Sequence, residues 1–198
     1  DKAMALGCVA EVIANIGPAA VNYSEAILEH IVKGLSNDME MVRRNAVYCL
    51  GVLIESTGDQ LVAHFMTILE ALAPLCARSA DQQTTDAGGA DVDNALAALA
   101  RMINVDKTQV PLPQVIPALL NALPLRVDFM EGEGIFSCIA TLLSEGEPTV
   151  VANLPLVLSV MAQTMTTEFK YDDKTKGICQ EAIKSASNTF GDLFNQAV

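Results

Sequence analysis

The chain has 198 residues, 51% of them hydrophobic and 18% charged, so it is not a disordered sequence and can bury a core. Its formal net charge of -12 disfavours nucleic acid as a partner and favours basic partners, although acidity that only keeps the surface soluble stays an alternative. No uninterrupted apolar run reaches the roughly 18 residues that a bilayer-spanning helix needs, so we expect no membrane insertion.

The first predicted helix covers residues 5–13, and the chain begins at Asp1 inside what reads as a helix, without an initiator Met. We therefore expect the sequence to be part of a longer protein. Residues 22–35 predict the next helix, because apolar residues recur there at three- and four-residue steps. Gly17 and Pro18 predict the break between the two helices.

Residues 41–55 and 60–78 predict two further helices, with a break at Gly58 and Asp59. The next segment, SADQQTTDAGGADV at residues 79–92, reads as one long polar loop that carries Asp81, Asp86 and Asp91. Its glycines Gly88 and Gly89 are expected to interrupt helical structure. We interpret this segment as a mobile, tolerated insertion.

The second half of the chain predicts helices over 94–103, 112–125, 135–143 and 148–165, and a weaker one near 178–186. Pro117 and Pro155 occupy matching places in two of them, and each should bend its helix because it removes a backbone donor.

Several of these segments superimpose when the sequence is shifted. ALGCVAEVI (5–13) matches AVYCLGVLI (46–54), and IFSCIATLL (135–143) matches both, while NALAALARMI (94–103) aligns 49 residues after Asn45. A period of about 40 to 49 residues is typical of HEAT and armadillo helical repeats. We predict an all-α solenoid of about four and a half antiparallel helix hairpins that forms a single segment over residues 1–198.

The residues of enzymes and metal sites are sparse. His30 and His64 lie in helices without evident catalytic partners, and the Gly132–Gly134 pair flanking Glu133 follows no strand. The cysteines are odd in number, lie in apolar helical surroundings and form no CxxC pair, so we expect free buried thiols in a reducing compartment. They are Cys8, Cys49, Cys76, Cys138 and Cys179. We expect no catalysis, no cofactor and no metal.

VRRNAVYCLGVL (42–53) has the form of the second helix of a HEAT pair, here called the B helix. Together with DNALAALARMI (93–103) and LPQVIPALLNALPLRVDFMEGEGIFSCIATLL (112–143), it resembles the C-terminal repeats of importin-β-type karyopherins, in the importin-4 branch. The resemblance covers nearly the whole chain, is strong over 38–143 and is weak over the final helix.

The resemblance implies a nuclear import receptor that shuttles between cytoplasm and nucleus. Such receptors carry basic cargo, notably core histones and ribosomal proteins, or a nuclear localisation signal peptide. It also implies Ran as a partner of the full-length receptor, at an N-terminal arch that lies outside this segment. The alternative is a HEAT-repeat scaffold for the assembly of other proteins.

A helical wheel over 41–55 separates a core arc from an opposite arc that carries Asn45 and Tyr48. Matching positions in the following B helices extend this arc into a ladder on the face that B helices present to the groove of HEAT arrays. Amides there can hold a peptide backbone, carboxylates can pair with Lys or Arg, and a tyrosine ring can contact a cation. The predicted cargo-binding residues are Asn45, Tyr48, Asp93, Asn94, Glu131 and Glu133.

Each of these residues also has an ordinary interpretation. The two asparagines can fasten neighbouring repeats, Tyr48 can be a partly buried packing residue, and Glu131 and Glu133 can be solvated charges. The charge distribution supports the cargo-binding interpretation of the ladder, since residues 81–147 carry ten acidic and only three basic residues.

Overall fold

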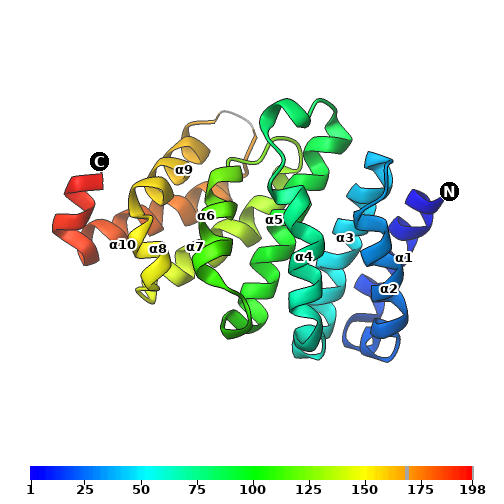
Figure 1. The fold of residues 1–198 in the computed structure, drawn as a ribbon. Coiled ribbons are helices and arrows are strands. Elements are labelled where there is room, and N and C mark those ends of the chain that lie inside the picture. The colour runs from blue at the N-terminus through cyan, green and yellow to red at the C-terminus, as the bar shows by residue number, and fades with distance from the viewer. Residues whose placement is uncertain (168–169, 198) are drawn as a thin grey trace.

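Stacked helix pairs make up the whole described fold, which we take from a computed structural model covering residues 1–167 and 170–197. Figure 1 shows the pairs following one another in chain order from the N-terminus to the C-terminus. The α-helices are α1 (Lys2–Ile16), α2 (Ser24–Leu35), α3 (Glu40–Thr57), α4 (Phe65–Cys76), α5 (Asp86–Asp106), α6 (Leu112–Ala122), α7 (Gly132–Ser144), α8 (Pro148–Ala152), α9 (Leu154–Thr166) and α10 (Asp173–Ala197). Short 3-10 helices join them: η1 (Gly17–Tyr23), η2 (Gly58–His64), η3 (Ala80–Gln82), η4 (Lys107–Gln109) and η5 (Phe129–Glu131).

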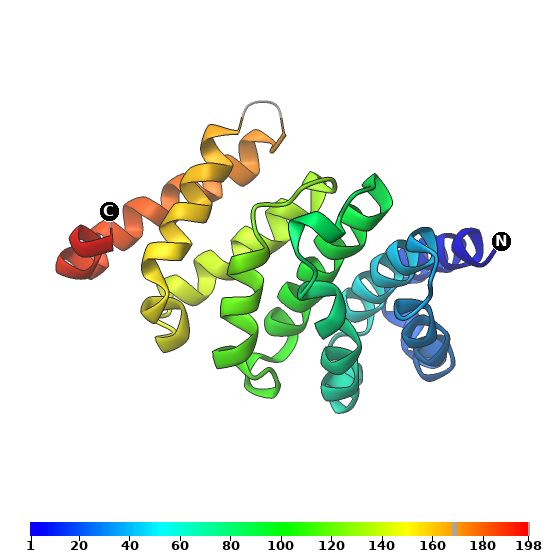
Figure 2. The ribbon, with the colours of Figure 1, turned by 45° about the horizontal axis from the view of Figure 1, so that its top comes forward.

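The helices form two layers. In the B layer, α1, α3, α5, α7 and α10 each contact the next in that order, and in the A layer α2 contacts α4, α4 contacts α6 and α6 contacts α9. Figure 2 shows the resulting elongated stack. One continuous apolar core runs between the layers, from Ile13 through Leu50 and Leu96 to Ile139 and Cys179. The predicted all-α solenoid is confirmed, because each pair buries its apolar stripe against its neighbours.

The predicted helix breaks are confirmed at two equivalent places. Gly17 and Gly58 end α1 and α3 with φ angles of 54° and 58°, a left-handed conformation that glycine adopts without steric cost. The predicted bend near Pro155 takes the form of a break at Asn153, which separates α8 from α9. These two helices together stand where the sequence predicts one.

The prediction of a long loop over residues 79–92 is wrong, because α5 already begins at Asp86. Thr85 caps this helix, and its side-chain oxygen accepts a hydrogen bond from the Gly88 backbone N–H at 3.0 Å. Gly88 and Gly89 do not break the helix. A Cβ atom at Gly89 would lie 2.5 Å from the Val127 side chain, so the glycines allow close packing instead.

One acid of that segment, Asp91, is a buried charge. Asp91 is 0% exposed, and its carboxylate accepts hydrogen bonds from Arg43 Nε at 2.8 Å and from Arg78 Nη1 at 2.9 and 3.0 Å. Arg43 belongs to α3, Arg78 to the turn that follows α4, and Asp91 to α5. The cluster therefore connects successive helix pairs. The two arginines are 48 and 13 residues away from Asp91 in sequence, which is why the acidic segment reads as surface when it is viewed alone.

Residues Lys2–Leu35 have the length and composition of a membrane-spanning helix, contrary to the expectation from uninterrupted apolar runs. In the structure this stretch is not one helix, because η1 separates α1 from α2 and both pack on α3. Its apolar residues, such as Ile13 and Ile31, enter the core between the layers.

Candidate binding site on the B layer

A hollow of about 500 Å³ opens on the B layer over α1, α3 and α5. We call it the B-layer hollow. It is lined by Met4, Gly7, Cys8, Glu11, Arg44, Asn45, Tyr48, Asn94 and Asp128. Three of the six predicted binding residues, Asn45, Tyr48 and Asn94, therefore meet in one place, as the helical wheel indicates.

Tyr48 is the most accessible of these three side chains, with 37% of its surface exposed. Its position follows from the helix period, since α3 directs Ala46, Cys49 and Leu50 into the core and Tyr48 to the opposite side. Partial burial raises the pKa of the Tyr48 hydroxyl, and the negative charges of Glu11, Glu131 and Asp128 raise it further. Arg101 acts in the opposite direction, so three carboxylates and one guanidinium make up the charged surroundings of the ring.

The two asparagines bond across neighbouring helix pairs. Asn45 Nδ2 donates to the Ala3 backbone oxygen at 2.6 Å, which joins α3 to α1. Asn94 is 3% exposed, and its Nδ2 donates to the Ala90 backbone oxygen at 2.8 Å and to Asp128 Oδ2 at 3.0 Å. The fastening role weighed for both residues is therefore present in the structure.

Asp93 does not face an open groove. It is 1% exposed, and Oδ2 accepts hydrogen bonds from the backbone N–H groups of Arg126, Val127 and Asp128 at 3.1, 2.7 and 2.8 Å. The carboxylate binds successive backbone N–H groups of the segment between α6 and η5, in the way that an acidic side chain caps a helix N-terminus. A wheel that starts from α3 misplaces it, because this segment folds back over the N-terminal turns of α5.

Glu131 is also largely buried, at 9% exposure, and its Oε2 lies 2.9 Å from Arg101 Nη1. Arg101 Nε in turn donates to Glu55 Oε2 at 3.0 Å. Glu133, in the first turn of α7, pairs with Lys174 of α10 at 2.6 Å and keeps 43% of its side chain exposed. These two acids already hold cations from the chain itself.

Six of the nine lining residues were not predicted, among them Cys8, Glu11 and Asp128, and neither was the nearby Arg101. The 41-residue shift aligns Glu11 with Val52, one helical turn beyond Tyr48, and so a wheel over 5–13 would have found it. Cys8 is exposed, contrary to the expectation of a buried thiol, because α1 packs on α3 with the face that carries Ala10 and Ile13. Asp128 lies between helices, where periodicity gives no direction.

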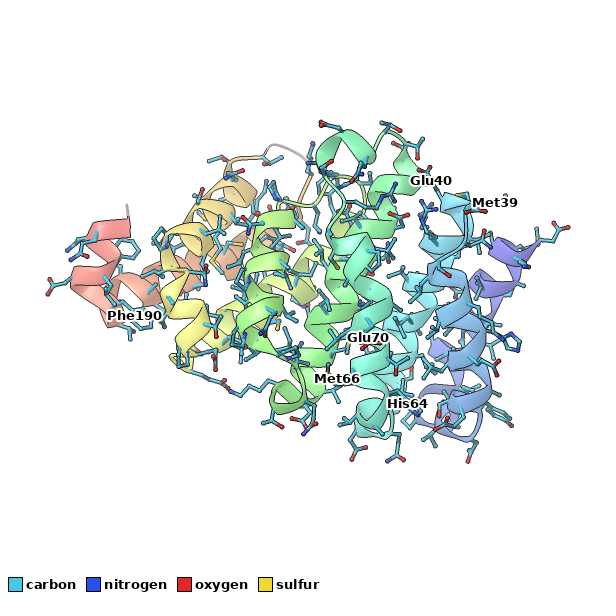
Figure 3. All side chains as sticks on the ribbon, viewed as in Figure 1. Met39, Glu40, His64, Met66, Glu70 and Phe190 are labelled. Carbon is cyan, nitrogen blue, oxygen red and sulfur yellow. The ribbon has the colours of Figure 1, made fainter. Side chains whose placement is uncertain are left out.

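The A layer presents a different surface, and no A-layer helix lines the hollow. Figure 3 shows His64, Met66 and Glu70 together along η2 and α4. His64 Nε2 lies 2.9 Å from a Glu25 oxygen, so this histidine has a structural partner in α2. Within residues 1–167 and 170–197, no three His, Cys, Asp or Glu side chains gather in a way that would hold a metal ion.

The fold and the hollow define an α-solenoid whose B layer carries an acidic recess. Comparison with known proteins then narrows the class, although no family model matches the chain. It is 27% identical over 166 residues, 84% of its length, to the probable importin subunit beta-4 of Schizosaccharomyces pombe. It is 32% identical over 160 residues, 81% of its length, to human importin-4, and 33% identical over 131 residues, 66% of its length, to mouse importin-4.

These similarities place the chain with the importin-β-type karyopherins of the importin-4 branch. The predicted resemblance is confirmed. The chain spans only 12 to 15% of the length of these relatives, so it corresponds to a short run of their helical pairs.

Proposed function

We propose that this chain is a cargo-binding segment of a nuclear import receptor and that its B layer binds an extended, Lys- or Arg-rich segment of the cargo. Histone tails, basic segments of ribosomal proteins and nuclear localisation signals have this chemistry. The receptor would shuttle between cytoplasm and nucleus, and Ran would act mainly on other repeats of the full-length protein. The names of the relatives support transport, and the hollow supports basic cargo.

The observation that carries the proposal is the pair of carboxylates beside Tyr48. Glu11 and Asp128 both line the hollow, and neither pairs with a cation among the residues that the structure describes. Arg44 brings a single positive charge to the same lining, so the recess stays net negative. A lysine side chain can place its stem against the Tyr48 ring and its ammonium between the two acids.

The six residues chosen from sequence then have different roles in the proposal. Tyr48 would contact the cargo directly, and Asn45 and Asn94 would form the floor of the hollow. Asp93 would hold Asp128 in place through its backbone N–H. Glu131 would hold Arg101 in place, and Glu133, whose side chain is 43% exposed, would meet cargo that extends toward α10.

The test is a titration of the 198-residue chain with a lysine-rich peptide. The double variant Glu11→Lys, Asp128→Asn removes both carboxylates, while the amide oxygen introduced in place of Asp128 can still accept the bond from Asn94. We expect binding at least tenfold weaker, a loss of about 1.4 kcal/mol, because a charge-assisted hydrogen bond contributes about 1.5–3 kcal/mol.

The matched control is Glu70→Lys, Asp59→Asn, which changes the net charge equally on exposed residues outside the hollow. We expect this control to weaken binding by less than about threefold, because it removes only long-range attraction between the chain and the peptide. Equal losses in the two variants would show diffuse electrostatics instead of a site. Peptide binding that does not weaken with added salt would favour the scaffold alternative.

A further inference from the structure

Arg101 lies in the B layer, on the same helix as Asn94 of the hollow. Its guanidinium bridges Glu55 of α3 and Glu131 of η5, at 3.0 and 2.9 Å, while the side chain itself belongs to α5. Carboxylates from two neighbouring helix pairs thus hold a cation that comes from the pair between them. The same chemistry, two acids around one basic group, is what the proposed function assigns to the hollow.

The surrounding residues leave space for this guanidinium. A Cβ atom at Gly51 would lie 3.2 Å from Arg101 Nη1, so the absence of a side chain at this position lets the guanidinium lie against α3. Arg101 keeps 25% of its side chain exposed and Glu55 keeps 68%, whereas Glu131 keeps 11%. The position is therefore open to solvent on one side and closed on the other.

The hollow and this second position share one stripe of the B layer. Tyr48 and Glu55 are seven residues apart on α3, and Asn94 and Arg101 are seven apart on α5, which is two turns or about 10 Å along each helix. An extended peptide covers that distance in about three residues. A basic segment with two cationic side chains spaced by three would reach both positions.

We propose that Arg101 is a specificity-determining residue that fills the second cation position of the B layer from within the chain. The wild-type groove then accepts one basic side chain of the cargo, at the hollow, and gains little from a second one three residues away. This inference rests on the proposed function. It adds that the chain limits the number of cargo charges by supplying one of its own.

The experiment compares two peptides of equal length and equal net charge. In one, two lysines are three residues apart. In the other, the second lysine is moved to the far end, beyond reach of α5. We expect wild type to bind the two within about threefold of each other. Arg101→Ala frees Glu55 and Glu131, so this variant should bind the closely spaced peptide about tenfold more tightly than the other.

Removal of Arg101 leaves Glu131 uncompensated and lowers stability. Arg101→Gln keeps a hydrogen-bond donor beside Glu131 without the charge, and it should show the same preference if the alanine variant unfolds. Arg101→Lys retains the internal cation and should bind like wild type. Circular dichroism and the unfolding midpoint identify which variants are folded.

The outcomes separate the two proposals. If neither peptide binds wild type, the proposed function fails. If wild type binds both through Glu11 and Asp128 but folded Arg101 variants show no preference for the closely spaced peptide, Arg101 is a structural clasp and the inference is overturned. A wild-type preference of tenfold for close spacing would overturn it equally, since the second position would already be open.

Discussion

Asp93 shows how one buried side chain can organise the surface of the hollow without being exposed on it. Its buried carboxylate receives three consecutive backbone N–H groups and so fixes the segment that ends in Asp128 and η5. Without those bonds, the amides would be desolvated with no acceptor, which costs about 1–3 kcal/mol for each group left unpaired. The position of Asp128, which lines the hollow, thus depends on Asp93, which is buried.

We expect Asp93→Ala to lower the free energy of unfolding by at least about 2 kcal/mol and Asp93→Asn by less, because the amide oxygen still accepts. Urea unfolding monitored by circular dichroism measures both. Asp81→Ala, an exposed acid in η3, is the control and should change stability by less than about 0.5 kcal/mol. Equal stabilities for Asp93→Ala and Asp81→Ala would contradict the fastening role.

Where α2 crosses α3, two small residues, Gly34 and Ala46, set the contact distance. A Cβ atom at Gly34 would lie 2.7 Å from Ala46 Cβ, so α2 approaches α3 more closely than side chains at both positions would allow. Neither atom belongs to a flexible side chain that could move away. At Gly177 in α10, by contrast, a Cβ atom would meet nothing within 4 Å.

The same substitution should therefore have opposite effects at these two helical positions. We expect Gly34→Ala to cost about 1–3 kcal/mol by overpacking, and Gly177→Ala to gain up to about 1 kcal/mol from helix propensity. For a chain of this size that corresponds to about 2–4 °C in unfolding midpoint for each kcal/mol. A raised midpoint for Gly34→Ala would show that the layers are less tightly packed than the structure indicates.

At the scale of the helices, the sequence predicted where the helices lie, but it predicted only some of their ends. Apolar steps over 22–35 and 41–55 determine where α2 and α3 lie, and the equivalent glycines Gly17 and Gly58 determine where α1 and α3 end. The start of α5 was missed because Asp91 reads as a surface residue. Its burial depends on arginines brought in by the tertiary fold, and local patterns carry no information about them.

At the scale of the whole molecule, the repeat predicted the solenoid and brought Asn45, Tyr48 and Asn94 to one face, where they line the hollow. The repeat could not predict how deeply each side chain is buried. It places Asp93, Asn94 and Tyr48 on the same stripe of the B layer, but their exposed fractions are 1%, 3% and 37%. The difference comes from the segment between α6 and η5, which folds over two of them. A helical wheel also cannot foresee that Arg101 is held by acids from both neighbouring pairs.

The positions of the cysteines allow access to the hollow to be measured in the chain without any substitution. Cys8 lines the hollow and is exposed, whereas Cys49 and Cys138 are buried, and burial raises the pKa of each of these two thiols to about 12. Thiolate is the reactive form, so an alkylating reagent at neutral pH should modify Cys8 long before the two buried residues. The rate of Cys8 modification thus reports on the access of reagent to the B-layer hollow.

The most direct test of the account is therefore the rate of Cys8 alkylation with and without a saturating lysine-rich peptide, followed by mass spectrometry of the digested chain. A peptide seated over Tyr48, between Glu11 and Asp128, should slow modification of Cys8 at least fivefold, and an acidic peptide of equal length should leave the rate unchanged. If calorimetry shows that the lysine-rich peptide binds while Cys8 reacts at its original rate, the binding site lies elsewhere and the central claim is wrong.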